Sequence, residues 1–78
     1  MNAIFTGKGT ETLEGYSFQV RFLGREIACL VSSEALQDID PENRFNSAEQ
    51  QFLANQRHFV DQAERTIIAA IPAAVRVA

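Results

Sequence analysis

The chain has 78 residues, of which 46% are hydrophobic and 22% charged, a balance typical of one small globular domain. Seven basic residues against ten acidic ones give a net charge of −3. This charge argues against a dedicated binder of nucleic acid or anionic membranes, since such proteins carry a basic excess. We expect a single domain over residues 1–78, with its core in about 3–71 and a flexible tail over 72–78.

The chain offers few groups for a cross-link or a cofactor. Cys29 is the single cysteine, so an internal disulfide is impossible, and no His/Cys cluster has zinc-site spacing. The N-terminus lacks the regions of a signal peptide, and the longest apolar run, residues 67–71, is far shorter than the ~20 residues that span a bilayer. We therefore expect a cytoplasmic protein without cofactor, metal or membrane contact. Chains this short commonly gain stability from a partner subunit, which favours a homodimer.

Strand signals dominate the first third of the chain. Ala3–Phe5 predicts a short strand, and Gly7–Thr10 predicts a loop after it. From Gly15 onward, aromatic and β-branched residues alternate with polar ones. This period of two predicts a strand whose apolar face is formed by Tyr16, Phe18, Val20 and Phe22.

A β-hairpin is predicted next. Gly24-Arg25 fits a two-residue type II′ turn, in which glycine supplies the positive φ, so that Leu23 faces Glu26. A slip of one residue would scatter the apolar side chains over both faces of the hairpin. The expected register keeps six of them on one face, in the pairs Phe22–Ile27, Val20–Cys29 and Phe18–Val31.

A short helix follows the hairpin. Ser32 or Ser33 caps it, and it runs through residues 34–37. Asp40-Pro41 interrupts it because the residue before a proline avoids the α region. Asp40 also fits as the cap of a single turn with Pro41 in its first position.

The second helix signal is the longer one. Ser47 and Gln50 form a capping box, with Asn46 and Glu49 as an overlapping alternative, and Pro72 ends the helix about six turns later. Its apolar stripe consists of Phe52, Phe59, Val60, Ala63, Ile67, Ala70 and Ile71. Apolar faces of sheet and helix must cover each other. The predicted fold class is therefore α+β: a small antiparallel sheet, made of the hairpin and a short N-terminal strand, packed against a short helix and a long C-terminal helix.

Two segments resemble a known family. One is residues 18–36, FQVRFLGREIACLVSSEAL, and the other is the helical pattern Phe52-x-x-x-x-Arg57-x-x-Val60-x-x-Ala63-x-x-x-Ile67. Both are similar to the small bacterial proteins of the domain of unknown function 1488 family, over most of residues 16–68. The resemblance implies a bacterial α+β protein with strands first and helices after. Family members often have a tryptophan near position 13, where this chain has Leu13. No activity is assigned to the family, so no site residue is carried over.

A phosphate-binding loop is one tempting interpretation of the glycine segment. Gly7-Lys8-Gly9-Thr10 resembles part of such a loop, which requires an earlier glycine where this chain has Asn2. It also requires a following helix, whose N-terminal N–H groups meet the phosphate. Because a strand follows here, we interpret the segment as an ordinary glycine loop.

A calcium loop is a second tempting interpretation. Counted from Asp38, oxygen-bearing side chains fall at the ligand positions Asp38, Asp40, Glu42, Asn46 and Glu49. Position six, however, is Asn43 where a calcium loop has glycine, and Pro41 stiffens the segment. These residues favour solvated carboxylates near helix N-termini over a metal site.

Charge is unevenly distributed along the chain. Residues 34–49 contain five acids and one base, whereas the first 33 residues have no net charge. This pattern indicates either a solvated connection or an acidic surface for a basic partner. The candidate binding residues on this surface are Glu34, Asp38, Asp40 and Glu42.

Arg21 and Arg25 are the candidate binding residues on the hairpin, and they support an alternative function, weak RNA or nucleotide binding. The aromatic residues nearby belong to the apolar face, where core packing is their commoner use. Cys29 has no adjacent base, and His58 lies off the helical stripe on another element. We therefore predict no catalytic residue and no enzymatic activity. The leading hypothesis is a non-catalytic protein–protein interaction or regulatory module with an unidentified protein partner.

Overall fold

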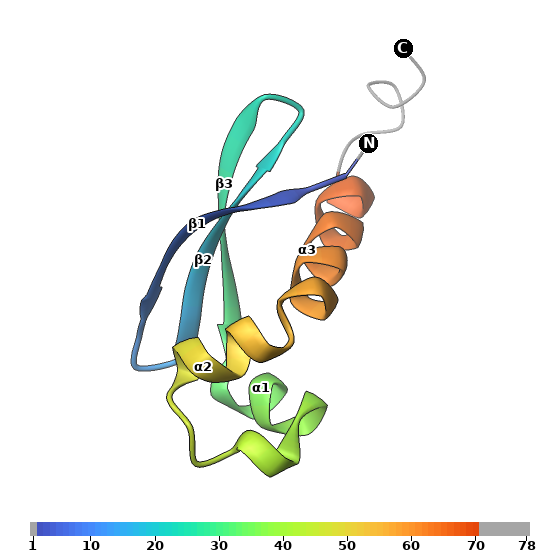
Figure 1. Cartoon of the computed structure of the whole chain (residues 1–78). Coiled ribbons are helices and arrows are strands. Elements are labelled where there is room, and N and C mark those ends of the chain that lie inside the picture. The colour runs from blue at the N-terminus through green and yellow to red at the C-terminus, as the bar shows by residue number, and fades with distance from the viewer. Residues whose placement is uncertain (1, 71–78) are drawn as a thin grey trace.

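The fold places all strands before all helices, as Figure 1 shows. In this computed structural model, which describes residues 2–70, three antiparallel strands form a sheet in the order β1-β2-β3. The strands are β1 (Ile4–Glu11), β2 (Gly15–Phe22) and β3 (Arg25–Ser32). The helices are α1 (Ser33–Ile39), the 3-10 helix η1 (Pro41–Asn43), α2 (Ala48–Ala54) and α3 (Gln56–Ala70). The predicted α+β class is confirmed; the predicted tail over 72–78 lies outside the described residues.

The turn between β2 and β3 lies one residue earlier than the sequence predicts. Leu23 and Gly24 are its central residues, with φ values of 53° and 76°, and two successive positive φ values are typical of a type I′ turn. The predicted type II′ turn is therefore wrong. The register moves by two residues, which leaves every side chain on its expected face. The inner-face pairs become Val20–Ile27, Phe18–Cys29 and Tyr16–Val31.

The glycine segment belongs to β1 rather than to a loop, so the short N-terminal strand is longer than predicted. Two additional residues bulge out of β1 between the pairs Phe5–Val20 and Gly9–Phe18. A Cβ at Gly9 would lie 2.1 Å from Tyr16 Oη, so glycine lets the tyrosine ring cover the strand. The glycines of this segment therefore serve a bulge and a close contact.

The helix caps are largely as predicted. Ser32 caps α1, and its hydroxyl accepts a hydrogen bond from the Ala35 N–H at 3.1 Å. At the start of α2, Ser47 and Gln50 form both bonds of the capping box. Asp40 precedes η1 with Pro41 in first position, but its carboxylate makes no cap bond.

The predicted single long helix is broken at Asn55, which separates α2 from α3. The Asn55 side chain donates to Asp40 Oδ2 at 2.9 Å and to the Gln51 carbonyl oxygen at 3.2 Å. Its backbone N–H bonds to Phe52 O, three residues back. These bonds hold Asn55 out of helical geometry, so the chain turns and α3 takes a different direction from α2 (Figure 1).

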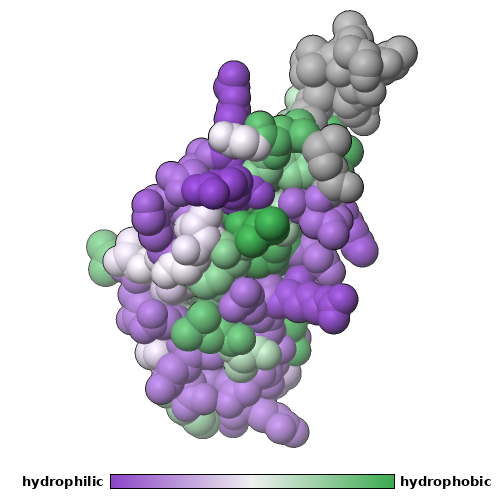
Figure 2. Space-filling model, turned by 45° about the horizontal axis from the view of Figure 1, so that its top comes forward, coloured by the Kyte–Doolittle hydropathy of each residue, from purple (hydrophilic) through white to green (hydrophobic). Residues whose placement is uncertain are grey.

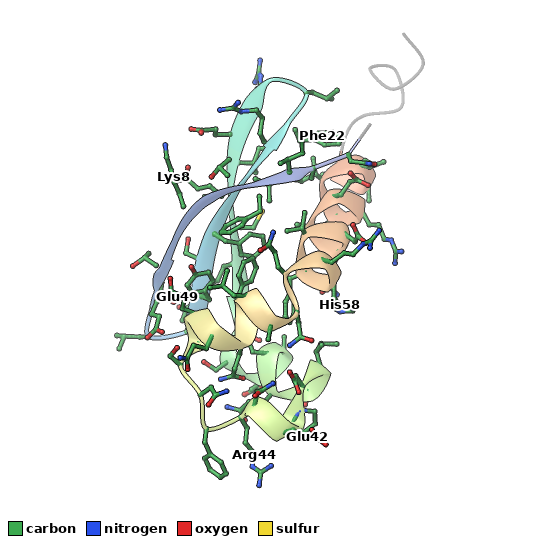
Figure 3. The ribbon with its side chains drawn as sticks, in the orientation of Figure 1. Lys8, Phe22, Glu42, Arg44, Glu49 and His58 are labelled. Carbon is green, nitrogen blue, oxygen red and sulfur yellow. The ribbon has the colours of Figure 1, made fainter. Side chains whose placement is uncertain are left out.

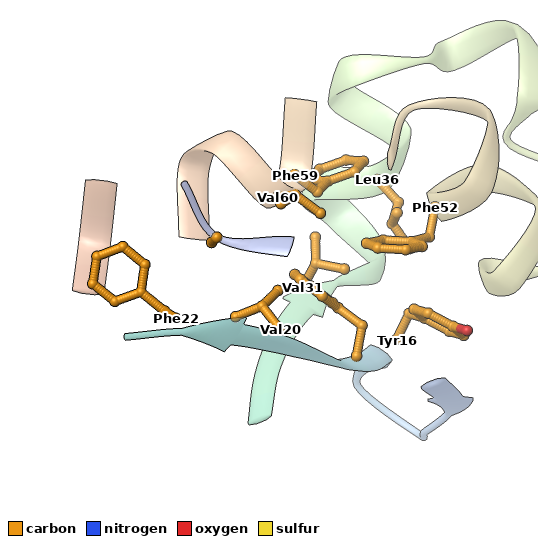
Figure 4. Packing of buried hydrophobic residues seen from close by; sticks show 10 residues of the cluster. Tyr16, Val20, Phe22, Val31, Leu36, Phe52, Phe59 and Val60 are labelled. Carbon is orange, nitrogen blue, oxygen red and sulfur yellow. The ribbon is translucent and has the colours of Figure 1, made fainter. Parts of the chain in front are cut away.

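The core lies between the inner face of the sheet and the helices, as the close-up in Figure 4 shows. Phe52 is fully buried at its centre. Its ring centroid lies 4.5 Å from that of Phe18, 4.9 Å from Tyr16 and 5.2 Å from Phe5. Of the predicted helical stripe, Phe59 and Val60 are also buried. Ala63 and Ile67 are half-buried, Ala70 is exposed, and Ile71 lies outside the described residues.

Candidate interaction surface

The outer side of β3 pairs with no other strand of residues 2–70. Just beyond β3, the Ser33 N–H donates to Glu14 O at 2.9 Å, in register with the β2–β3 pairs. Because hydrogen bonds alternate along an antiparallel pair, odd-numbered residues of β3 bond to β2 and even-numbered ones point their backbone groups outward. The residues whose backbone N–H and C=O groups point outward are Glu26, Ala28, Leu30 and Ser32. Their side chains are all exposed.

An open groove of about 560 Å³ adjoins this strand edge. Its walls come from β2, β3 and the adjoining helices, and none of its residues is charged. The apolar lining residues are Phe18, Ile27, Ala28, Cys29, Leu30, Val31, Ala35, Phe59, Ala63 and Ile67, and the polar ones are Ser32, Gln62 and Thr66. Loss of charged residues marks the centres of protein interfaces.

Cys29 lies in the groove as a half-buried thiol. Its Sγ is 3.8 Å from Ile27 O, and burial raises the pKa of the thiol. A raised pKa keeps the sulfur protonated at neutral pH, so it is a poor nucleophile. His58 is exposed on α3 (Figure 3) and is not among the residues that line the groove. Cys29 and His58 therefore lie on different elements, β3 and α3, as the sequence predicts.

The acidic candidates gather at the end of the molecule opposite the β2–β3 turn. Glu34, Asp38 and Glu42 are exposed there. Glu11 and Glu14, at the turn between β1 and β2, lie at the same end of the molecule. The Glu49 N–H donates to Glu11 Oε2 at 3.2 Å, which ties α2 to β1. With Asp40 and Glu49 this end holds seven carboxylates and one base, Arg44, a net charge of −6. Figure 2 shows hydrophilic side chains over most of this lower end.

Asp40 differs from its acidic neighbours because it is half-buried and internally bonded. Its Oδ2 accepts hydrogen bonds from the side-chain amides of Asn55 and Asn43, and these two bonds hold the pKa of the carboxyl below its usual range. The carboxylate thus holds α1, η1 and the break before α3 together, a structural role that the sequence analysis did not assign.

The opposite end, at the β2–β3 turn, carries the basic candidates. Arg21 lies 3.6 Å from Glu26 Oε1, and Lys8 lies 3.8 Å from the same atom. Arg25 makes no ion pair with residues 2–70. With one acid and three bases, this tip has a net charge of +2. The molecule is therefore polarised along the direction of its strands (Figure 3).

Two further observations concern residues 2–70. No three His, Cys, Asp or Glu side chains lie close enough together to hold a metal ion, and this includes the four carboxylates of the calcium-loop pattern. No helix in this part of the chain has both the length and the apolar character needed to cross a bilayer.

Neither the groove nor the free edge of β3 is predicted from the sequence. A signal was present, since residues 27–33 form a run without any charge, proline or glycine. Such a run is usual for a central strand covered on both sides, and only the sheet order shows that it lies at an edge.

Comparisons with protein-family models, with curated proteins and with solved structures each found no match. The resemblance to the domain of unknown function 1488 family therefore stays a prediction. The β3 edge and its groove are the features of the molecule that bear on function.

Proposed function

We propose that this protein is a non-catalytic protein–protein interaction module of the cytoplasm, and that it binds its partner by strand addition to β3. In strand addition an extended segment pairs with a free sheet edge, so that main-chain hydrogen bonds supply affinity and side-chain pockets supply specificity. The observation that carries the proposal is the free edge of β3 beside an uncharged groove.

Both requirements of strand addition meet at β3. The outward groups of Ala28 and Leu30 supply donors and acceptors at the middle of the strand. Beside them the half-buried Ile27, Cys29 and Ile67 leave apolar surface in contact with solvent. An incoming strand would cover this surface with every second side chain.

The hairpin arginines support nucleic-acid binding less well. Single-stranded RNA is recognised by aromatic side chains that stack on its bases. On β2 the aromatic side chains, Tyr16, Phe18 and Phe22, are all buried in the core. Arg21 moreover shares Glu26 with Lys8, which reduces its attraction for phosphate.

A peptide-display selection tests strand addition. Random peptides are selected on the immobilised protein and then compared on two variants, Ala28→Pro and Ala28→Val. Proline removes one outward N–H of β3 and leaves the bonds to β2 intact, whereas valine keeps the N–H and favours the strand. The selected peptides should have alternating apolar residues, should bind the wild type and Ala28→Val, and should lose binding to Ala28→Pro.

If no peptide is enriched, or if the enriched peptides bind Ala28→Pro as well as the wild type, the edge of β3 is not the docking surface.

A further inference from the structure

We infer that the strand that adds to β3 is β3 of a second copy of this chain, antiparallel to the first, which produces a six-stranded sheet across a two-fold axis. This inference rests on the proposed function, because it uses the same edge and the same groove. It goes further in naming the partner, its direction and its register.

The polarity of the molecule selects an antiparallel copy. The hairpin tip carries a net charge of +2 and the opposite end −6, and β3 runs from one to the other. Antiparallel pairing brings the tip of each copy beside the start of α1 in the other. Arg25, which has no ion pair among residues 2–70, then approaches Glu34 of the other copy. Parallel pairing would instead place like charges together at both ends.

The side chains of β3 favour one register. Outward backbone groups must meet outward ones, so even-numbered residues of β3 pair with even-numbered residues of the copy. With the two-fold axis at Cys29, Ala28 meets Leu30 and Glu26 meets Ser32, while Ile27 meets Val31 on the inner face. A shift of two residues in one direction opposes Glu26 to Leu30, and a shift in the other opposes Glu26 to Glu34. The register centred on Cys29 alone pairs apolar with apolar and polar with polar.

The same symmetry closes the groove. An axis perpendicular to the sheet places both copies of α3 on one face, so that the two grooves join beneath them. Gln62 and Thr66, the polar groove residues on α3, are uncharged. They can therefore face the other copy without burying a charge. Leu30, which is 54% exposed in the single chain, gains Ala28 of the other copy as a neighbour on the outer face of the sheet.

A charge-exchange experiment tests this arrangement in sedimentation equilibrium. The two-fold axis gives each dimer two contacts between position 25 of one copy and position 34 of the other. Arg25→Glu places two glutamates together at both contacts, and Glu34→Arg places two arginines together at both. Each variant alone should dimerise about tenfold more weakly than the wild type. A mixture of the two restores both opposite-charge contacts and should form a heterodimer within about threefold of the wild-type affinity. Arg57→Glu makes the same change in charge on the side of α3 away from the groove, and should leave dimerisation unchanged.

Oxidation by diamide tests the register. At the axis, Cys29 forms a non-hydrogen-bonded pair, in which the Cα atoms lie ~4.5 Å apart. The wild type and Ala28→Val should form a disulfide-linked dimer, and Ala28→Pro, which keeps Cys29, should form at least tenfold less.

Three results would overturn the inference: a wild type that stays monomeric at all concentrations, a mixture no stronger than its components, and cross-linking equal in Ala28→Pro. A monomer that binds selected peptides at β3 would contradict the second copy and leave strand addition standing. A monomer whose Ala28 and Leu30 amides lose protection from exchange on deletion of residues 71–78 would assign the edge to this chain's own C-terminal segment.

Discussion

The two edges of the sheet differ in how they meet solvent. At β1 the register shifts by two residues, Gly7 has a φ of 88°, and the charged Lys8 lies in the bulge. Farther along β1, the Glu11 carboxylate binds the first turn of α2. At β3 all eight residues pair with β2 without a shift, and the middle of the strand carries no charge.

This difference indicates which edge is available for docking. Bulges, charges and covering elements are the devices with which proteins prevent a sheet edge from pairing with another chain. β1 has a bulge and a charged residue in its middle, whereas the central part of β3 has neither among residues 2–70. We therefore expect changes near β1 to alter the stability of the single chain, and changes near β3 to alter association.

Phe52→Ala should produce the largest effect, because the ring packs against Phe5 of β1 and against Tyr16 and Phe18 of β2. Removal of a buried phenylalanine costs ~3–5 kcal/mol of the free energy of unfolding. Since these contacts lie within one chain, the loss in urea unfolding should be the same at low and high protein concentration. A loss that depends strongly on concentration would place Phe52 in an interface.

Gly9→Ala should lower the free energy of unfolding by disturbing the contact between β1 and Tyr16. Its Cβ would lie 2.1 Å from Tyr16 Oη and 2.5 Å from Cζ, so the buried ring must move, at a cost of ~1–3 kcal/mol. Gly7→Ala is the control, because no atom lies within 4 Å of the added Cβ and only the backbone conformation is strained. Thermal unfolding of the two variants checks this, and a Gly9→Ala midpoint equal to that of the wild type would contradict the contact with Tyr16.

Ile27→Ala should distinguish the β3 edge from the β1 edge, because its effect on stability should depend on protein concentration. Ile27 is half-buried and lines the groove, so its truncation should cost the single chain ~1 kcal/mol, less than that of a fully buried isoleucine. At concentrations that favour the dimer, the loss should increase because the partner's β3 would cover the side chain. Urea unfolding over a series of concentrations measures both values. A loss that does not change with concentration would argue against an interface at β3.

Leu23→Asn should produce the smallest effect, a stabilisation of ~0.5–1 kcal/mol. Leu23 has a φ of 53° at the first central position of the hairpin turn, where asparagine before glycine is preferred. Its side chain is 56% exposed, so little packing is lost. The midpoint of thermal unfolding should increase, and a decrease would show that Leu23 makes contacts that compensate for its backbone strain.

Local patterns predict most elements of this fold, apart from the length of β1 and the break between α2 and α3. The alternation at Tyr16, Phe18 and Val20 gave the inner face of β2, and the serines at 32 and 47 gave the helix caps. The predicted turn between β2 and β3 is one residue too late, because the predicted and the observed register put the same side chains on the inner face. Only the positive φ of Leu23 distinguishes the two registers.

Contacts between distant segments were beyond the reach of local patterns. The break at Asn55 depends on its bond to Asp40, fifteen residues earlier, and the glycine at position 9 depends on the ring of Tyr16. The candidate surface was missed for the same reason. Strand order is a property of the whole sheet, so the run over residues 27–33 could not by itself be placed at an edge.

Residue-resolved amide hydrogen exchange over a series of protein concentrations tests the central claim, that β3 and not β1 is the docking edge. On β3 the outward amides are those of Ala28 and Leu30. On β1 they are those of Gly9 and Glu11, because Thr12 and Gly15 form a hydrogen-bonded pair and the bonded residues of β1 are therefore the even-numbered ones. Exchange at Ala28 and Leu30 should slow as the concentration increases, while exchange at Gly9 and Glu11 stays constant. Exchange that is independent of concentration at all four residues, or that slows equally at both edges, would contradict the claim.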